Sequence, residues 1–111
     1  MKNLFNKLIV TNVSLGASFN SDPQDLSSVD VYSIHAIWTG ASADGSIKLQ
    51  VSLDGSTWVD VSGTSTVVSG PGNVMWNSAY PVSQDKVRVV FTRTSGTGTI
   101  NVYMNAKAQE D

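Results

Sequence analysis

Hydrophobic and polar residues alternate along most of this chain. In the clearest run, residues 46–53, every second side chain is Ile, Val or Leu and those between are polar. The same alternation returns over residues 32–38, 86–92 and 99–104. A period of two places the apolar side chains on one face, which is typical of a half-buried β-strand. We therefore predict a strand over each run, and weaker strands over residues 8–13, 17–20, 57–61 and 65–68.

Turn-forming residues separate these runs. Asp44-Gly45 and Asp54-Gly55 lie on either side of the clearest run, and glycine-rich segments occupy residues 69–72 and 95–98. Asp-Gly and Gly-rich segments favour the positive φ angles of hairpin turns. Short strands joined by frequent turns indicate a sandwich or barrel. We predict one all-β domain over residues 1–111, a two-sheet antiparallel β-sandwich of jelly-roll or Ig-like type with about eight strands.

The two ends of the chain lie outside this pattern. We expect an N-terminal arm at residues 1–9 and a fraying C-terminal tail at residues 107–111. The arm carries Leu4, Phe5, Leu8 and Ile9, which fit no alternation. These side chains either cover one end of the sandwich or dock on a neighbouring subunit, because exposed apolar arms usually mark contacts.

We predict partner-binding roles for these four residues, with Arg88 and Arg93 as contacts at the rim of the interface. A chain that lacks residues 1–9 is then expected to fold but to lose its partner.

Composition narrows the range of functions. The 111 residues include no cysteine, so disulfides and thiolate metal sites are excluded. Charged residues make up 14% of the chain, against roughly 25% in an average domain. The basic residues are scattered and no apolar run approaches the ~20 residues of a membrane span, so we expect neither nucleic acid nor membrane as partner. A hydroxyl-rich, charge-poor surface suits contact with other proteins.

Catalytic chemistry has little support. The single histidine, His35, lies within a predicted strand, and a Ser-His-Asp triad would need an aligned serine beside it. The aspartates lie in or beside turns, where they commonly cap their own backbone. No metal-binding spacing is present. We therefore predict a protein that is not an enzyme, with no catalytic residues, no cofactor and no metal.

Three tryptophans, Trp38, Trp58 and Trp76, allow two interpretations. They form a sugar-stacking platform, or they pack in the core or at an interface. The alternation places Trp38 in phase with the apolar face of its strand, which favours the core.

Two segments together resemble a group of small phage and prophage structural proteins. They are SIKLQVSLDGSTWVDV at residues 46–61 and KVRVVFTRTSGTGTI at residues 86–100. In that group a strand ending in Ser-x-Asp-Gly-x-x-Trp is followed by an Arg-containing strand and a Thr-Ser-Gly-Thr-Gly-Thr hairpin. Residues 21–26 and 32–40 also fit, so the resemblance covers about residues 18–107. The Asp-Gly-x-x-Trp part alone is shared with discoidin-like and other sugar-binding sandwiches.

The resemblance implies a virion protein and supplies no catalytic residues. We expect a structural protein of a tailed phage, a capsid decoration (cement) protein on the outside of the shell. Its partners would be the major capsid protein and copies of itself, as a trimer or another small ring. The alternatives are a carbohydrate-binding module, with a glycan as partner, and a tail or baseplate accessory subunit.

Overall fold

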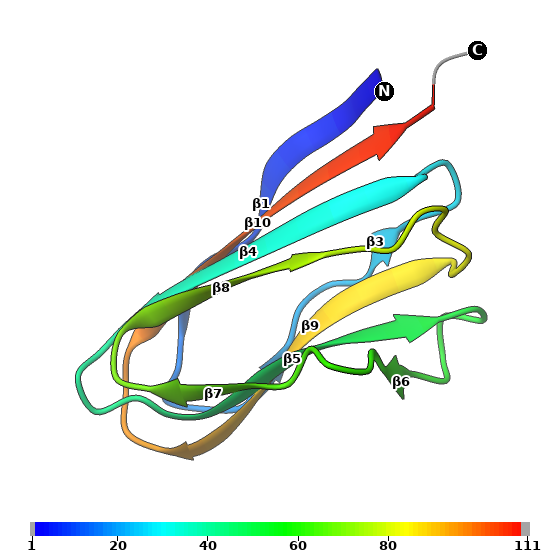
Figure 1. The fold of residues 1–111 in the computed structure, drawn as a ribbon. Helices are drawn as coiled ribbons and strands as arrows, with labels where there is room; N and C mark the ends of the chain where they lie inside the picture. Colours follow the sequence, from blue (N-terminus) through cyan, green and yellow to red (C-terminus); the bar gives the residue numbers. More distant parts are fainter. Residues whose placement is uncertain (1, 110–111) are drawn as a thin grey trace.

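The computed structural model describes residues 2–109, which form ten strands in two antiparallel sheets packed face to face (Figure 1). This confirms the predicted all-β sandwich. No helix able to cross a membrane occurs within these residues. The strands are β1 (Lys2–Ser14), β2 (Phe19–Asn20), β3 (Gln24–Asp25), β4 (Val31–Thr39), β5 (Asp44–Ser52), β6 (Val59–Asp60), β7 (Thr66–Ser69), β8 (Gly72–Asn77), β9 (Lys86–Ser95) and β10 (Thr99–Ala108).

The strand order identifies the kind of sandwich. Sheet A has the order β1-β10-β4-β8, and sheet B has the order β2-β9-β5-β6. In sheet B, β3 continues the edge begun by β2 on β9, and β7 shares the other edge with β6 on β5. Each sheet therefore has four strand positions, eight in all. The pairs are nested, with the first position beside the last and the second beside the last but one, as in a long hairpin rolled up into a jelly roll.

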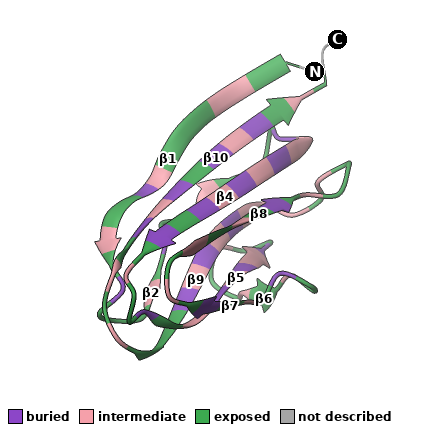
Figure 2. Cartoon of the chain, turned by 60° about the vertical axis from the view of Figure 1, so that its left-hand side comes forward, coloured by how far each residue is buried: buried purple, intermediate pink, exposed green. Residues whose placement is uncertain are grey.

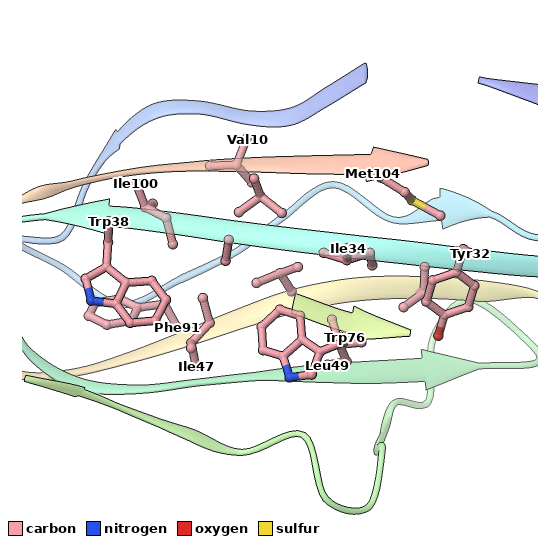
Figure 3. Close-up of a cluster of buried hydrophobic side chains, with 14 of the residues drawn as sticks. Val10, Tyr32, Ile34, Trp38, Ile47, Leu49, Trp76, Phe91, Ile100 and Met104 are labelled. Atoms are coloured by element: carbon pink, nitrogen blue, oxygen red, sulfur yellow. The ribbon is translucent and has the colours of Figure 1, made fainter. Parts of the chain in front are cut away.

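The core lies between the two sheets and consists of the apolar halves of the alternating runs. Figure 2 shows buried residues alternating with intermediate or exposed ones along β4 and β10. Buried side chains of sheet A, such as Ile34 and Met104, face Leu49 and Phe91 of sheet B (Figure 3). Packing of this kind removes apolar surface from water and is the main source of stability in a domain of this size.

Two of the three tryptophans belong to this core. Trp38 and Trp76 are both buried, and each indole Nε1 donates to a backbone carbonyl, Gly70 at 2.9 Å and Thr64 at 3.0 Å. Burial of the rings rules out an exposed stacking platform built from all three tryptophans.

Residues 2–9, expected in a separate arm, are instead the first part of β1. This strand is the edge of sheet A and pairs with β10 from Lys2 opposite Ala108 to Ser14 opposite Thr99. Its register shifts three times, between residues 3 and 5, 8 and 10, and 10 and 13. An extra residue at a bulge reverses the in-and-out phase of a strand. The alternation that marks the other strands is therefore lost here.

The end of the chain is also more regular than expected. Lys107 and Ala108, expected in a fraying tail, are the last residues of β10 and pair with β1, and Lys107 also pairs with β4. The amide of Gln109 donates to the carboxylate of Asp30. Residues 1, 110 and 111 lie outside the described residues.

The two ends of the sandwich differ. At one end the β4–β5 and β9–β10 connections touch backbone to backbone, and a Cβ built on Gly96 would lie 1.7 Å from the carbonyl oxygen of Ser42. At the other end the β3–β4 and β8–β9 connections are joined by two backbone hydrogen bonds, from Leu26 to Asp85 at 2.7 Å and from Val82 to Asp30 at 2.9 Å, yet hollows remain among these connections and the β5–β6 connection. Space for a ligand is therefore found at the second end.

Candidate functional site

The outer face of sheet A carries a row of exposed side chains that crosses all four strands. The register places Leu8 of β1 opposite Tyr103 of β10, Tyr103 opposite His35 of β4, and His35 opposite Met75 of β8. Leu8, Tyr103 and Met75 are 41%, 43% and 55% exposed. Ile37, also exposed, lies on the same face of β4 two residues further on. We call these five residues the Tyr103 row. Contiguous apolar groups on a surface mark sites of contact.

Neutral polar side chains frame the Tyr103 row. They bond to one another across neighbouring strands at 2.7–3.3 Å, so their polar groups are already partly satisfied. The pairs are Asn12 with Asn101, Asn3 with Asn105, Ser33 with Asn77, Thr39 with Thr99, and His35 with Asn73. A shallow hollow of about 230 Å³ lies among Asn6, Ser33, His35, Met75, Tyr103 and Asn105.

Permanent charge is nearly absent from this face. Within residues 2–109, the outward positions of β4, β8 and β10 include one lysine, Lys107, at the end of β10, and the edge strand β1 carries two exposed lysines, Lys2 and Lys7. Covering an ionised group with another protein requires removing its hydration, which is unfavourable unless a partner charge replaces it. This face can therefore be covered at a lower desolvation cost than a charged one.

The apolar residues predicted to bind a partner divide between the outside and the inside of the molecule. Leu8 is exposed and belongs to the Tyr103 row. Leu4, Phe5 and Ile9 are only partly exposed and pack against the core. The bulges of β1 turn these three side chains away from the surface on which Leu8 lies.

The two arginines lie away from that face. Arg88 is on β9 in sheet B, where its Nε and Nη2 donate to Oε1 of Gln50 at 3.0 and 2.8 Å. Its guanidinium stacks over the ring of Trp58 at 4.2 Å. Arg93 is near the tight end of the sandwich and donates from Nε to the carbonyl of Gly96 at 3.0 Å. The structure therefore does not bring the six predicted residues together into one site.

Arg88 is part of a polar network on the outer face of sheet B. The carboxylate of Asp60 accepts from Gln50 Nε2 at 2.8 Å and from Lys48 Nζ at 2.9 Å. The hydrogen bond from Gln50 first, and that from Lys48 second, lower the pKa of Asp60 below its usual range. The side chains of this network hydrogen bond to one another, and the guanidinium of Arg88 covers one face of Trp58. Its geometry suits holding β5, β6 and β9 together.

The groups that carry most enzyme chemistry are dispersed. His35 is half-exposed on the outside of sheet A, and its Nε2 lies 3.3 Å from the amide oxygen of Asn73 rather than beside a serine. Asp54 accepts from the backbone amides of Thr57 and Ser56, in that order of effect, which lowers its pKa to about 2. That aspartate caps its own turn. Within residues 2–109, no three His, Cys, Asp or Glu side chains gather where they could hold a metal ion.

Most of the Tyr103 row was not identified from the sequence. Tyr103, Met75 and His35 come from three strands, and their alignment depends on register. The sequence signal that could have identified these residues is an apolar side chain at a strand position where the alternation predicts a polar one. Ile37 and Tyr103 both have this feature.

Comparison with known proteins identifies structures with a similar fold but no protein family. No protein-family model matches the chain, and no curated protein matches its sequence. Among solved structures, PBSX exported protein XepA matches with a TM-score of 0.65 and 15% identity over 97% of this chain, which spans 38% of that one. SPBc2 prophage-derived protein YomS matches with a TM-score of 0.57 and 11% identity over 91% of both chains. A chain of infectious bursal disease virus, Gx strain, matches with a TM-score of 0.55 and 5% identity over 94% of this chain and 31% of that one.

At these identities the likeness concerns the fold. The chain has an all-β fold shared with a prophage-derived protein of similar length and with part of a virus structure. This agrees with the fold that the resemblance to phage and prophage structural proteins implied.

Proposed function

We propose that this chain is an accessory structural protein of a tailed-phage particle, and that it acts as a decoration protein on the outside of the capsid. The observation that carries the proposal is the Tyr103 row, a mostly apolar line across all four strands of a sheet face that carries little charge. The partner to which we commit is the major capsid protein. Copies of this chain, as a trimer or another small ring, would contact one another through other surfaces.

The size and chemistry of the face support a docking role. The two longer extents of the molecule are 48 and 26 Å, so one face offers on the order of 1,000 Å², more than the ~800 Å² per partner of a standard interface. Stable interfaces have an apolar and aromatic centre within a polar rim. Tyr103 and Met75 provide such a centre, and the surrounding asparagine, serine and threonine side chains provide such a rim.

The shared fold adds support of a different kind. A jelly roll of this size is found over nearly the full length of prophage-derived YomS. A protein that stiffens a shell needs a rigid body and a docking face rather than a reactive site. The compact two-sheet sandwich and the Tyr103 row are what support these two roles.

Surface substitutions test this proposal better than a truncation does. Removing residues 1–9 would strip most of the β1 pairing from β10 and disturb the fold itself. We would therefore compare Tyr103→Asp and Met75→Asp with Val67→Asp. Val67 is 74% exposed on β7 in sheet B, so it is an apolar surface residue away from the Tyr103 row.

The assay measures copies bound per shell, by sedimentation of particles grown without this protein and then mixed with it. Charging the centre of an interface removes a dominant contact, so we expect Tyr103→Asp to weaken binding by about 30-fold or more. Val67→Asp should bind like the wild type. Wild-type binding by both sheet A variants would exclude this face as the docking surface. Binding to isolated tails and not to tailless shells would overturn the decoration role in favour of a tail accessory subunit.

A further inference from the structure

A cleft opens between the two sheets at the end that carries the β8–β9 connection. Its volume is about 210 Å³. Tyr32 and Trp76 of sheet A and Leu49 and Val51 of sheet B form its walls, and the β8–β9 connection, residues 78–85, lies over its mouth. None of the side chains that line it is charged. The cleft is thus a neutral space lined by both apolar and polar side chains, with two aromatic rings.

Tyr32 places a polar group in this space without a protein partner. The residue is only 6% exposed, and Figure 3 shows its ring reaching from β4 toward β5 with the oxygen at the far end. Within residues 2–109, the Tyr32 hydroxyl makes no hydrogen bond. In the same range, every side-chain oxygen or nitrogen that is fully shielded from solvent does have a hydrogen-bond partner, so the Tyr32 hydroxyl is not fully shielded. The Tyr32 hydroxyl is therefore reached from the cleft. Burial raises the pKa of Tyr32, so the hydroxyl remains protonated and able both to donate and to accept.

Gln84 supplies a second uncommitted polar group. It is half-buried at the mouth of the cleft, and among the described residues none hydrogen bonds to its side chain. Gln84 also borders two neighbouring hollows, one beside Leu53 and Val59 and one beside Asp30. The cleft and the two hollows are therefore neighbours that meet at Gln84.

The volume and chemistry of the cleft limit the ligand. At ~30 Å³ per water it holds about seven waters, and it is smaller than the ~300–1,000 Å³ sites that take drug-sized ligands. Its neutral lining disfavours an ion. The Tyr32 hydroxyl and the Gln84 amide match a ligand that carries hydroxyls, since a hydroxyl both donates and accepts.

We propose that this cleft binds one neutral sugar residue, with the Tyr32 hydroxyl and the Gln84 amide bonded to sugar hydroxyls and Trp76 and Val51 packed against its C–H face. Further residues of a glycan would lie in the hollow beside Leu53. This site differs from a surface platform of tryptophans, because the aromatic rings line the cleft walls. It does not rest on the proposed function, since the Tyr103 row lies on the outer face of sheet A.

The experiment is a titration of the intact, isotope-labelled protein with methyl glycosides of glucose, galactose, mannose, N-acetylglucosamine and N-acetylgalactosamine. We expect at least one sugar to shift the Trp76 indole and Gln84 amide resonances, with saturation in the millimolar range. Tyr32→Phe removes one hydrogen bond and should weaken that binding by about tenfold. Tyr103→Phe, the same change on the outer face of sheet A, should leave it unchanged.

The Tyr32→Phe variant separates a loss of sugar binding from a loss of folding. Tyr32→Phe removes a hydroxyl that no described residue binds, so it should fold like the wild type, which its spectrum verifies. No response to any of the five sugars would overturn the proposal, as would wild-type affinity in Tyr32→Phe. A response to N-acetyl-leucine amide but to none of the sugars would also overturn it, and would assign the cleft to an apolar side chain of a partner protein.

Discussion

Replacing Ser21 with alanine should destabilise the fold out of proportion to the single atom removed. Ser21 lies between β2 and β3, where the edge of sheet B is interrupted. Its backbone amide donates to the carbonyl of Val89 at 2.8 Å, and its Oγ accepts from the amide of Val89 at 2.8 Å. The serine hydroxyl thus takes the place of a carbonyl in the strand ladder. Ser21 is 7% exposed and Val89 is fully buried, so Ser21→Ala leaves the Val89 amide without an acceptor and away from water.

The expected loss of stability is set by the unpaired backbone amide of Val89. A buried donor left without a partner costs about 1–3 kcal/mol. In a domain of about 100 residues, each kcal/mol lowers the melting temperature by about 4 °C. We therefore expect Ser21→Ala to melt about 4–12 °C below the wild type while remaining folded, because the total stability of such domains is about 5–15 kcal/mol.

The assay is thermal unfolding followed by tryptophan fluorescence, with amide hydrogen exchange at Val89 as a local readout. Ser28→Ala is the matched control, because Ser28 is exposed and lies on the same segment between β2 and β4. The control should stay within about 0.5 kcal/mol of the wild type. If Ser21→Ala melts within about 1 °C of the wild type and the Val89 amide stays protected, the hydroxyl is not what satisfies that amide, and the reasoning fails.

Two further predictions concern the turns. Gly96 and Gly63 both have a φ of +80°, but a Cβ would lie 1.7 Å from the Ser42 oxygen at Gly96 and meets nothing within 4 Å at Gly63. Gly63→Ala should therefore lower the free energy of unfolding only by the ~1–2 kcal/mol that the left-handed conformation costs an alanine, and Gly96→Ala should lower it clearly more. Urea unfolding measures both losses. Equal losses in the two variants would contradict the close backbone packing at the Gly96 end. Asp54 has its pKa lowered from 3.8 to about 2 in the folded chain, so its stabilising effect is present above pH 3.8 and is lost as the pH falls through about 2. Asp54→Asn should flatten the decline in stability over that range, and an NMR titration midpoint near 3.8 for Asp54 would contradict the capped geometry.

Much of the fold was predictable because four strands show an alternation of apolar and polar residues with few exceptions. Residues 32–38, 46–51, 86–92 and 99–104 each have one apolar face that the structure places in the core or packs against it, whereas Leu53 at the end of the second run is exposed. The choice between jelly-roll and Ig-like order was not predictable. That choice depends on which strands pair, and the alternation of a strand carries no information about its neighbour.

Some features of the fold and of the candidate sites were not predicted from the sequence, and each omission has an identifiable physical cause. β1 reads as an irregular arm because its bulges reverse the phase of the alternation. The strands β2, β3 and β6 have two residues each, too few to show a period. The Tyr103 row assembles from four strands by register, and the sugar cleft assembles from two sheets and a connection, so neither is visible in any one segment of the sequence.

The nested pairing described above also bears on how the chain folds. Its outermost partners, Lys2 and Ala108, are 106 positions apart, whereas the β9–β10 hairpin closes within a few residues. By the logarithmic dependence of loop entropy on length, closing the longer loop costs about 2 kcal/mol more than closing one of ten residues. The β1 edge is therefore the part whose pairing is entropically most expensive, although it joins the two ends of the chain side by side. A short linker between those ends, with new termini at the exposed turn near Gly63, would convert this most distant contact into a local hairpin and leave the same jelly roll to form by a less costly route.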